Sequence, residues 1–333
     1  MALAVVTGGG GFLGSAIVRA WLADGNRVRS FSRQRYRCLE EWGVEQIQGD
    51  LANGQAVSKA IKGSDLVFHC AAKAGVWGPA EVYERANVLG TKNVIAACKL
   101  HNVEKLVFTS SPSVVFAGTD QAGVDESVPY PKRFLAHYPR TKAKAEAMVN
   151  LANSEDLATV SLRPHLIWGP GDPHLVPRLI EKARLGRLRL VGDQDGLVDS
   201  VYVDNAAQAH VMAAKHLQFD SALGGKNYFI TNGEPCTMAE LINGILATAG
   251  LLPIEKRVSG KMAYTAGAFF EMLYRCVGAK KEPPMTRFVA RQLATAHWFD
   301  ISAAQRDFDY QPLVSHREGL QRLRAWFQDH PQF

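Results

Sequence analysis

Short apolar runs alternate with amphipathic segments along the first half of the chain. The apolar runs are rich in β-branched residues, as is typical of buried strands: Ala2–Val6, Arg27–Phe31, Gln46–Gln48, Asp65–Cys70, Lys105–Thr109 and Thr159–Leu162. The segments between them carry apolar residues at helical spacing: Phe12–Ala23, Ala56–Lys62, Val82–Leu100 and Thr141–Leu151. This alternation predicts an α/β fold, a doubly wound parallel sheet with right-handed crossovers and helices on both faces.

The alternation loosens after Trp168. A turn cluster at Gly169–Asp172 leads into four further segments with helical spacing: Leu175–Leu185, Asn205–Leu217, Met238–Ala249 and Met262–Val277. We therefore predict a doubly wound domain at residues 1–168. Residues 169–333 are expected to form a smaller, mostly helical region that is interleaved with the last sheet strands.

Composition and charge narrow the classes of partner. The chain has 333 residues, of which 47% are apolar and 21% charged, enough to bury one large core or one core with a smaller cap. Lys and Arg number 38 against 32 Asp and Glu, but the basic residues are scattered along the chain. This distribution argues against a nucleic-acid partner and is compatible with attraction of small anions.

Cysteine usage, the start of the sequence and the length of its apolar segments predict a cytoplasmic protein. The five cysteines are odd in number and include no CxxC pair, so neither a disulfide framework nor a zinc knuckle is indicated. Met1 leads directly into the first predicted strand without a basic n-region. The segment Met262–Val277 is interrupted by Glu271 and Arg275 and is too short to cross a bilayer, so we expect a buried or interfacial helix.

The stretch TGGGGFLG, Thr7–Gly14, ends the first predicted strand and opens the first predicted helix. Glycines at this position allow a tight turn, the approach of backbone N–H groups to a pyrophosphate, and close packing of the helix on the sheet. Two spacings fit, because Gly9, Gly11 and Gly14 match GxGxxG while Gly8, Gly11 and Gly14 match TGxxGxxG. Either spacing predicts that the first region is a Rossmann domain that binds a dinucleotide and that the second region binds the substrate.

The end of the second predicted strand favours NADP(H). The stretch Ser30–Arg33 places a hydroxyl and a guanidinium where NAD-preferring folds carry an acidic residue. Because a guanidinium pairs well with a phosphate, Arg33 predicts NADPH, with a solvated loop arginine as the alternative. After the third strand, Asp50 and Leu51 are expected beside the adenine, with a helix N-cap as the alternative role of Asp50.

Three side chains form a candidate catalytic site. Tyr138 and Lys142 are four positions apart, so they share one face of the helix that Pro139 helps to begin. The Lys142 ammonium is then expected to lower the pKa of the phenol. YxxxK alone is common by chance, but a strand-end Ser111 and an N-terminal glycine loop make catalysis a stronger prediction than simple packing of a Tyr and a Lys.

These motifs resemble those of the extended short-chain dehydrogenases/reductases. The stretches that carry the resemblance are TGGGGFLG, HCAAKAG at His69–Gly75, NVLGT at Asn87–Thr91, TSSPS at Thr109–Ser113, YPRTK at Tyr138–Lys142 and LRPHLIWGPGD at Leu162–Asp172. The cofactor-binding residues that it implies are Gly8, Gly11, Phe12, Leu13, Gly14, Arg33, Asp50, Leu51, Ala71, Ala72, Asn87, Lys142 and Pro164. The resemblance thus favours the TGxxGxxG spacing, and it implies that Asn87 braces the central strands.

The same resemblance implies the catalytic roles. Tyr138 is the general acid that protonates a carbonyl oxygen as hydride arrives from the nicotinamide. Lys142 lowers the pKa of Tyr138 and binds the nicotinamide ribose. Ser111, or in second place Ser113, donates a hydrogen bond to the substrate oxygen. No metal is expected.

A narrower resemblance covers almost the whole chain. AAKAGVWG at Ala71–Gly78, YVDNAAQAH at Tyr202–His210, EPPMTRF at Glu282–Phe288 and RDFDYQP at Arg306–Pro312 are similar to the 3β-hydroxysteroid dehydrogenase-like branch. Within that branch, the chain is similar to the bacterial 2-alkyl-3-oxoalkanoate reductases of long-chain olefin biosynthesis. This implies NADPH-dependent reduction of the 3-keto group of a long-chain 2-alkyl-3-oxoalkanoic acid, ahead of a β-lactone-forming enzyme. The alternatives are an NAD-dependent 3β-hydroxysteroid or sterol dehydrogenase, a non-catalytic nucleotide-sensing Rossmann protein and a sugar-nucleotide epimerase.

A long-chain substrate requires an apolar wall. The candidates are Met262–Val277 with Tyr264, Phe269, Phe270, Met272 and Leu273, together with Trp77 and Trp168, and ordinary core packing is the alternative for them. Lys73 is the candidate partner of the substrate carboxylate, or else a solvated loop lysine. Asp172 and His174 are too few to hold a metal, and His165 and His210 are expected to be structural. The family suggests a homodimer, and contact of residues 262–277 with a membrane surface or an olefin-pathway enzyme stays open.

Overall fold

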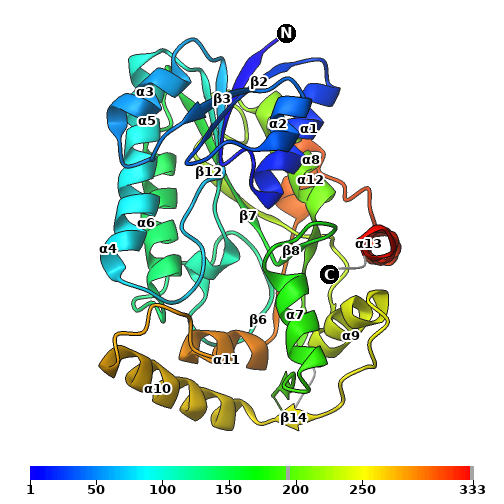
Figure 1. Ribbon diagram of the computed structural model, residues 1–333. Helices are drawn as coiled ribbons and strands as arrows, with labels where there is room; N and C mark the ends of the chain where they lie inside the picture. Colours follow the sequence, from blue (N-terminus) through cyan, green and yellow to red (C-terminus); the bar gives the residue numbers. More distant parts are fainter. Residues whose placement is uncertain (193–195, 331–333) are drawn as a thin grey trace.

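A seven-stranded parallel sheet forms the centre of the computed structural model, which describes residues 1–192 and 196–330 (Figure 1). Its strands are, in spatial order, β12 (Lys226–Ile230), β7 (Ala158–Pro164), β5 (Lys105–Thr109), β4 (Leu66–His69), β1 (Leu3–Thr7), β2 (Arg27–Ser32) and β3 (Glu45–Gln48). The chain runs outward from β1 to β3 and then returns to β4 on the other side of β1. Ligands of such sheets bind beyond the carboxyl ends of the strands at this reversal. The predicted doubly wound Rossmann fold is confirmed.

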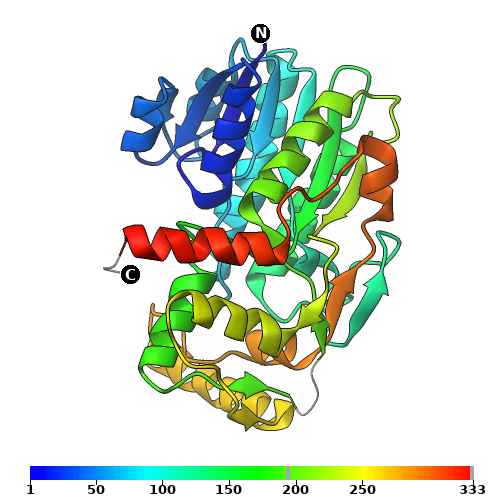
Figure 2. The ribbon, with the colours of Figure 1, turned by 90° about the vertical axis from the view of Figure 1, so that its right-hand side faces the viewer.

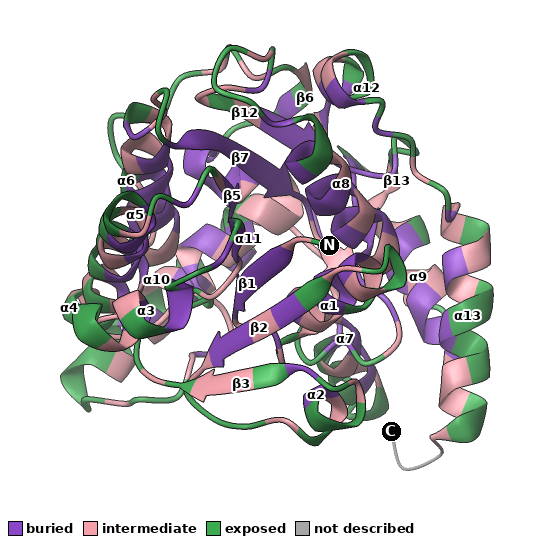
Figure 3. Ribbon diagram, turned by 90° about the horizontal axis from the view of Figure 1, so that it is seen from above, coloured by how far each residue is buried: buried purple, intermediate pink, exposed green. Residues whose placement is uncertain are grey.

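Helices cover both faces of the sheet. Helices α1 (Phe12–Ala23) and α8 (Val203–His216) pack together on one face, and α3 (Gly54–Ile61), α5 (Gly90–Leu100) and α6 (His137–Leu151) cover the other. Figure 3 shows the inner strands buried between these layers, with β3 more exposed at the edge. Because both faces are covered, an inner strand such as β1 is apolar at consecutive positions and does not alternate.

One predicted helix is interrupted by a π-helical turn. The segment expected to be a single helix, Val82–Leu100, consists of α4 (Ala80–Tyr83), a π-helical turn at Glu84–Leu89, and α5. Such turns are rare and are frequently found at functional sites. Asn87 lies in this turn and is buried.

The chain after β7 contributes both to the central sheet and to a group of helices below it. Helices α7 (Leu175–Arg184), α9 (Met238–Thr248), α10 (Gly260–Cys276) and α11 (Arg287–Ala294) gather below the carboxyl ends of the sheet, with the strand pair β9 (Leu190–Val191) and β14 (Arg257–Val258) (Figures 1 and 2). Helix α13 (His316–Asp329) packs on α9. Strand β12 and helices α8 and α12 (Ser302–Phe308) instead return to the sheet. The division at residue 168 therefore stays a prediction, since the sheet takes its edge strand from beyond it.

The remaining elements are short. They are α2 (Arg37–Glu41), the strand pair β8 (Ile167–Trp168) and β11 (Val201–Tyr202), and a mixed sheet of β13 (Cys236–Thr237), β10 (Leu197–Val198), β15 (His297–Phe299) and β6 (Gln121–Val124). Within the described ranges, none of the helices combines the length and apolarity that crossing a bilayer requires.

Candidate active site

The glycine loop joins β1 to α1 and leaves little room for side chains. Gly8 has a φ of +74°, which favours glycine, and a Cβ there would lie 3.2 Å from Ala71. A Cβ on Gly14 would lie 2.1 Å from the carbonyl oxygen of Gly8, and the Gly11 N–H donates to that same oxygen at 2.8 Å. Gly9 faces strand β2 instead, where a Cβ would lie 2.7 Å from a serine hydroxyl. Gly8, Gly11 and Gly14 therefore form one turn in mutual contact.

The beginning of α1 offers donors next to this turn. Among the described residues no side chain caps the helix, and its first turn contains no acidic residue. The N–H groups of Phe12 and Leu13 belong to the first turn, where backbone donors have no intrahelical partner. Together with the helix dipole they favour an anion, so the loop fits the pyrophosphate of a dinucleotide.

Arg33 lies exposed just beyond the end of β2. The guanidiniums of Arg35 and Arg37 pair with Glu40 and Glu41 at 3.6 and 2.9 Å. Arg33 makes no ion pair with a described carboxylate, although its charge helps to lower the pKa of nearby Asp50, so its guanidinium hydrogen-bond donors are available to a ligand at this strand end.

Asp50 and Leu51 follow β3. The Asp50 carboxylate accepts a backbone N–H at 2.9 Å and pairs with Arg85 at 3.2 Å. The backbone hydrogen bond, assisted by Arg85, holds the pKa of Asp50 below its ordinary value. Asn53 caps α3, so the alternative role of Asp50 as that cap is wrong. The Leu51 carbonyl accepts a hydrogen bond from Asn93 at 2.7 Å.

Asn87 joins the loop after β4 to helix α6. Its side-chain oxygen accepts the Lys73 N–H at 2.7 Å, and its Nδ2 donates to the Lys73 carbonyl at 3.1 Å and to Thr141 Oγ1 at 3.0 Å. We expected Asn87 to brace the central strands, but its polar contacts fix this loop against α6. The same loop begins with Ala71, which abuts the glycine turn, and the exposed Ala72.

Lys142 is buried, with 2% of its surface exposed. Its ammonium donates to the backbone carbonyl of Thr109, the last residue of β5, and lies 3.9 Å from the centre of the Phe108 ring. Burial lowers the pKa of Lys142 to about 7, although the charge of Glu146 acts in the opposite direction. The helix that carries Tyr138 and Lys142 is thereby fixed to the strand that leads to Ser111.

Tyr138 is the second residue of helix α6 and is partly buried. Burial raises the pKa of its phenol, and the hydrogen bond with Ser111 opposes this rise. The direction is opposite to the one we expected from Lys142, because desolvation dominates and the ammonium is directed at the Thr109 carbonyl. Ser113 Oγ lies 2.9 Å from Ser111 Oγ but is buried, so Ser111 is the more accessible of the two hydroxyls.

A buried ion pair lies behind Lys142. Arg163 donates to both carboxylate oxygens of Glu146, at 3.0 and 2.7 Å, and the Tyr130 hydroxyl donates to the same carboxylate at 2.7 Å. Such bidentate pairing compensates for the removal of both charges from water. Pro164 follows Arg163 and ends β7 beside β12.

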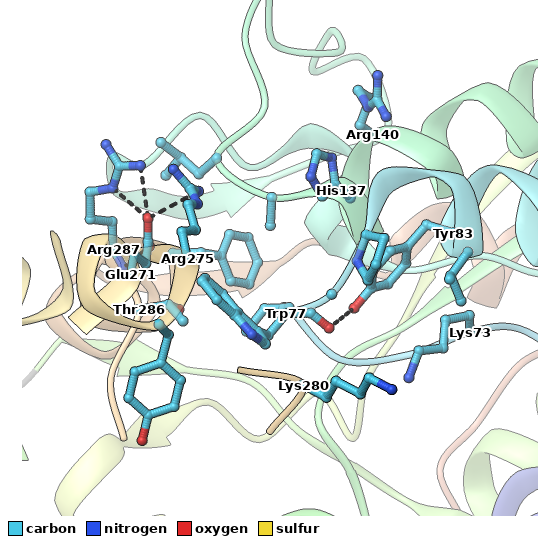
Figure 4. Close-up of a pocket in the computed structure, with 18 of the residues that line it drawn as sticks. Lys73, Trp77, Tyr83, His137, Arg140, Glu271, Arg275, Lys280, Thr286 and Arg287 are labelled. Atoms are coloured by element: carbon cyan, nitrogen blue, oxygen red, sulfur yellow. Dashed lines mark hydrogen bonds and ion pairs between the residues drawn. The ribbon is translucent and has the colours of Figure 1, made fainter. Parts of the chain in front are cut away.

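A cavity of about 940 Å³ lies beside the start of α6 (Figure 4). The loop after β4, the residues around His137, and the segment from α10 to α11 form its walls. Its apolar lining includes Val76, Trp77, Val82, Phe134, Leu135 and Phe288. Among the described residues, its charged lining consists of Lys73, Arg140, Arg275, Lys280, Arg287 and Glu271. Tyr138, Ser111 and Lys142 do not line it themselves, but His137 brings it to the residue next to Tyr138.

The two tryptophans that were proposed to line the substrate cavity lie in different environments. Trp77 lines the cavity and its indole N–H donates to the Ala279 carbonyl at 3.0 Å. Trp168 is fully buried and its indole N–H bonds to Ser200 at 3.0 Å, so the core alternative is confirmed for it.

Most of the predicted apolar wall on α10 does not face the cavity. Phe269, Met272 and Leu273 lie on the outer face with 56%, 58% and 42% of their surface exposed. Neither these residues nor Tyr264 and Phe270 line the cavity, so that interpretation is wrong. Tyr274 and its neighbours on the opposite face of the helix line it instead.

Other candidate groups have structural partners. His210 lies 2.8 Å from Thr109 Oγ1 and is buried, and the buried His165 lies 2.7 Å from His297, which confirms the expectation for both histidines. Asp172 accepts three backbone N–H groups at the start of α7.

Sequence reasoning missed two residues that shape the cavity. The buried Tyr83 donates its hydroxyl to the carbonyls of Gly75 and Trp77 at 3.0 and 2.9 Å. Lys280 reaches the cavity from the other wall. Lys280 is placed at the cavity by a contact between the loop after β4 and residues some two hundred positions later. No local sequence pattern indicates such a contact.

Comparisons with known proteins give matches over most of the chain. The sequence model of the 3-beta hydroxysteroid dehydrogenase/isomerase family matches residues 5–257. A 2-alkyl-3-oxoalkanoate reductase of Shewanella oneidensis is 54% identical over 330 residues, covering 97% of this chain and 85% of that protein. The mouse sterol-4-alpha-carboxylate 3-dehydrogenase, decarboxylating, is 36% identical and covers 95% of this chain and 88% of its own. The structure of the Thermus thermophilus UDP-glucose 4-epimerase complex with NAD is similar with a TM-score of 0.74 and 26% identity, covering 98% and 99% of the two chains.

Proposed function

Because the chain belongs to the 3-beta hydroxysteroid dehydrogenase/isomerase family, we propose that it is an NADPH-dependent reductase of long-chain 2-alkyl-3-oxoalkanoic acids. It reduces the 3-keto group to a hydroxyl, as a step of long-chain olefin biosynthesis. The observation that carries the proposal is that Tyr138 lies close enough to Ser111 for that hydroxyl to affect the pKa of its phenol, at the edge of a cavity with apolar walls. The 54% identity with a protein of that name supports the substrate class.

Tyr138 is the proton donor of the proposed reaction. When bound, the dinucleotide supplies the hydride that adds to the keto carbon. Negative charge then develops on the keto oxygen, to which Tyr138 gives its proton and Ser111 donates a hydrogen bond. The raised pKa of Tyr138 keeps the phenol protonated at neutral pH, so that the acid is ready when the charge appears.

Lys142 acts on this proton transfer through its charge. Below about pH 7 its ammonium is protonated. In the free protein it is directed at the Thr109 carbonyl and does not lower the pKa of Tyr138, and we propose that it favours the phenolate only once Tyr138 has donated its proton. The hydrogen bond to Thr109 fixes the ammonium relative to the strand that ends before Ser111.

Arg33 is proposed to select the phosphorylated cofactor. A guanidinium without a directly ion-paired carboxylate among the described residues is suited to a 2′-phosphate, and no acidic residue competes for the ribose within Ser30–Arg33. The solved structure of the Thermus thermophilus epimerase contains NAD, so the preference of this chain for NADP(H) is a proposal that rests on Arg33.

The reductive direction fits the chemistry of the substrate. A 3-oxo acid loses carbon dioxide readily, whereas the 3-hydroxy acid keeps its carboxylate. Reduction therefore preserves the group that a β-lactone-forming reaction requires next.

The test is an assay with a synthetic 2-alkyl-3-oxo acid and each nicotinamide cofactor. We expect oxidation of NADPH at 340 nm, a higher kcat/KM with NADPH than with NADH, and a product heavier than the substrate by two hydrogens. Absence of turnover with both cofactors would exclude the proposal.

An oxidative sterol dehydrogenase is the second candidate, since the mouse decarboxylating enzyme is 36% identical. A 3β-hydroxysterol-4α-carboxylate with NAD distinguishes the two. Ketone formation and carbon dioxide release from the sterol, without reduction of the oxo acid, would favour this second candidate.

A further inference from the structure

The cavity carries more positive charge than its own carboxylate neutralises. Arg275 and Arg287 both pair with Glu271, at 3.6 and 2.8 Å. Arg140 pairs with Glu84 at 3.2 Å. Within the described chain, neither of the two lysines of the lining, Lys73 and Lys280, has a carboxylate partner. Their ammonium groups are therefore available to an anionic ligand.

Lys73 is fixed relative to the catalytic helix. Both polar groups of its backbone are bonded to Asn87, which also donates to Thr141 on α6. Thr141 immediately precedes Lys142, and Lys73 comes two positions after Ala71 at the glycine turn. The Lys73 ammonium lies 5.9 Å from the centre of the Tyr83 ring, on the cavity wall that the loop after β4 forms.

Lys280 belongs to the facing wall, which is tied to the wall of Lys73. Trp77 donates its indole N–H to the carbonyl of Ala279, the residue before Lys280. Tyr83 in turn donates to the Trp77 carbonyl, so the two loops form one bonded unit. Figure 4 shows the side chains of Lys73 and Lys280 extending toward the same part of the cavity.

A 3-oxo acid carries its carboxylate close to the reacting ketone. One carbon separates its carboxyl carbon from the keto carbon, so a group that binds the carboxylate has to lie beside the reacting ketone. The two alkyl chains then need apolar surface farther away, which Val82, Phe134 and Phe288 provide.

We infer that Lys73 and Lys280 together bind the carboxylate of the substrate, an inference that rests on the proposed function. The lysines approach the carboxylate from opposite walls, and charge-assisted hydrogen bonds hold it. The pair thereby distinguishes a 3-oxo acid from a neutral ketone with the same alkyl chains.

The experiment compares the 2-alkyl-3-oxo acid with its methyl ester, which has the same ketone and no charge. For Lys73→Met and for Lys280→Met we expect the ratio of kcat/KM for acid over ester to fall roughly tenfold or more, mainly through a higher KM for the acid. Lys73→Arg and Lys280→Arg should restore part of the ratio. The matched control is Lys281→Met, which removes an exposed lysine that does not line the cavity and should keep the wild-type ratio.

A second measurement covers variants with poor turnover. Calorimetric titration of the NADPH-saturated protein with the 2-alkyl-3-hydroxy acid, a pair between which no hydride can be transferred, should give a Kd roughly tenfold higher for each Met variant than for wild type. Unchanged ratios and unchanged Kd values in folded Met variants would overturn the carboxylate assignment while wild-type reduction of the acid leaves the proposed function standing. If wild type reduces neither acid nor ester, the proposed function itself fails.

Discussion

The Lys142 ammonium donates a hydrogen bond to the backbone carbonyl of Thr109 and so joins helix α6 to the end of the central strand β5. This bond fixes the distance between the start of α6, where Tyr138 lies, and the serines that follow Thr109. Because Lys142 is buried, its charge acts in a medium that screens it weakly. The arrangement keeps the proposed acid, Tyr138, and the proposed hydrogen-bond donor, Ser111, together before any substrate arrives.

Replacing Tyr138 by Phe removes the proton donor and preserves the ring. Turnover should fall by about 10²–10⁴-fold, the usual contribution of a positioned acid. The Kd for NADPH, measured by fluorescence titration, should change little because the glycine turn is untouched. Turnover within threefold of wild type would show that another group donates the proton.

Gly14→Ala tests the glycine turn. The new Cβ would lie 2.1 Å from the Gly8 carbonyl oxygen, a backbone atom, so the turn must shift and the Kd for NADPH should rise roughly tenfold or more. Gly54→Ala is the control, because a Cβ at this first residue of α3 has its nearest atom at 3.5 Å. That variant should bind NADPH normally and gain up to about 1 kcal/mol of stability. Equal affinity of both variants would contradict the role of the turn.

Arg33→Glu should reverse the preference between cofactors. The loss of a charge-assisted contact with the 2′-phosphate, together with the new repulsion, is expected to raise the KM for NADPH roughly 10- to 100-fold. The KM for NADH should rise less. Arg37→Glu is the comparison, since Arg37 lies on the same segment but is paired with Glu41. The same increase in the KM for NADPH in both variants would indicate a general effect of the changed net charge and not a specific contact of Arg33.

Acid should destabilise the protein through its buried histidines. Burial lowers the pKa of His69 to about 3 and that of His210 to about 4, from 6.5 in the unfolded chain. The unfolded chain therefore binds these two protons as the pH falls below 6.5, while the folded protein does not, so stability is lost from pH 6.5 downward. His210→Gln should reduce the loss of unfolding free energy between pH 7 and 5 by about 2 kcal/mol. Urea denaturation at both pH values measures this, and an identical loss in the variant would show that His210 does not carry it.

Local sequence determined the elements of the sheet and the identity of the chemical groups. The strand Lys105–Thr109 and the helix Phe12–Ala23 have the predicted bounds, because continuous β-branched runs and helical spacing are local signals. The glycine turn was also predictable, since its steric demands fall within eight residues. The helix of Tyr138 and Lys142 began somewhat earlier than expected but placed both residues as their spacing requires.

Tertiary structure alone decided the environment of these groups. Burial raised the pKa of Tyr138, although the sequence suggested that a nearby ammonium would lower it. Helix α10 turned its apolar Phe269 outward and Tyr274 toward the cavity, a choice that its helical period leaves open because it depends on what packs against each face. The placement of Lys280 and Lys73 on one cavity depends on an indole hydrogen bond between segments about two hundred residues apart. Sequence fixes which side chains exist and how neighbours are spaced, whereas desolvation and long-range contacts exist only once the chain has folded.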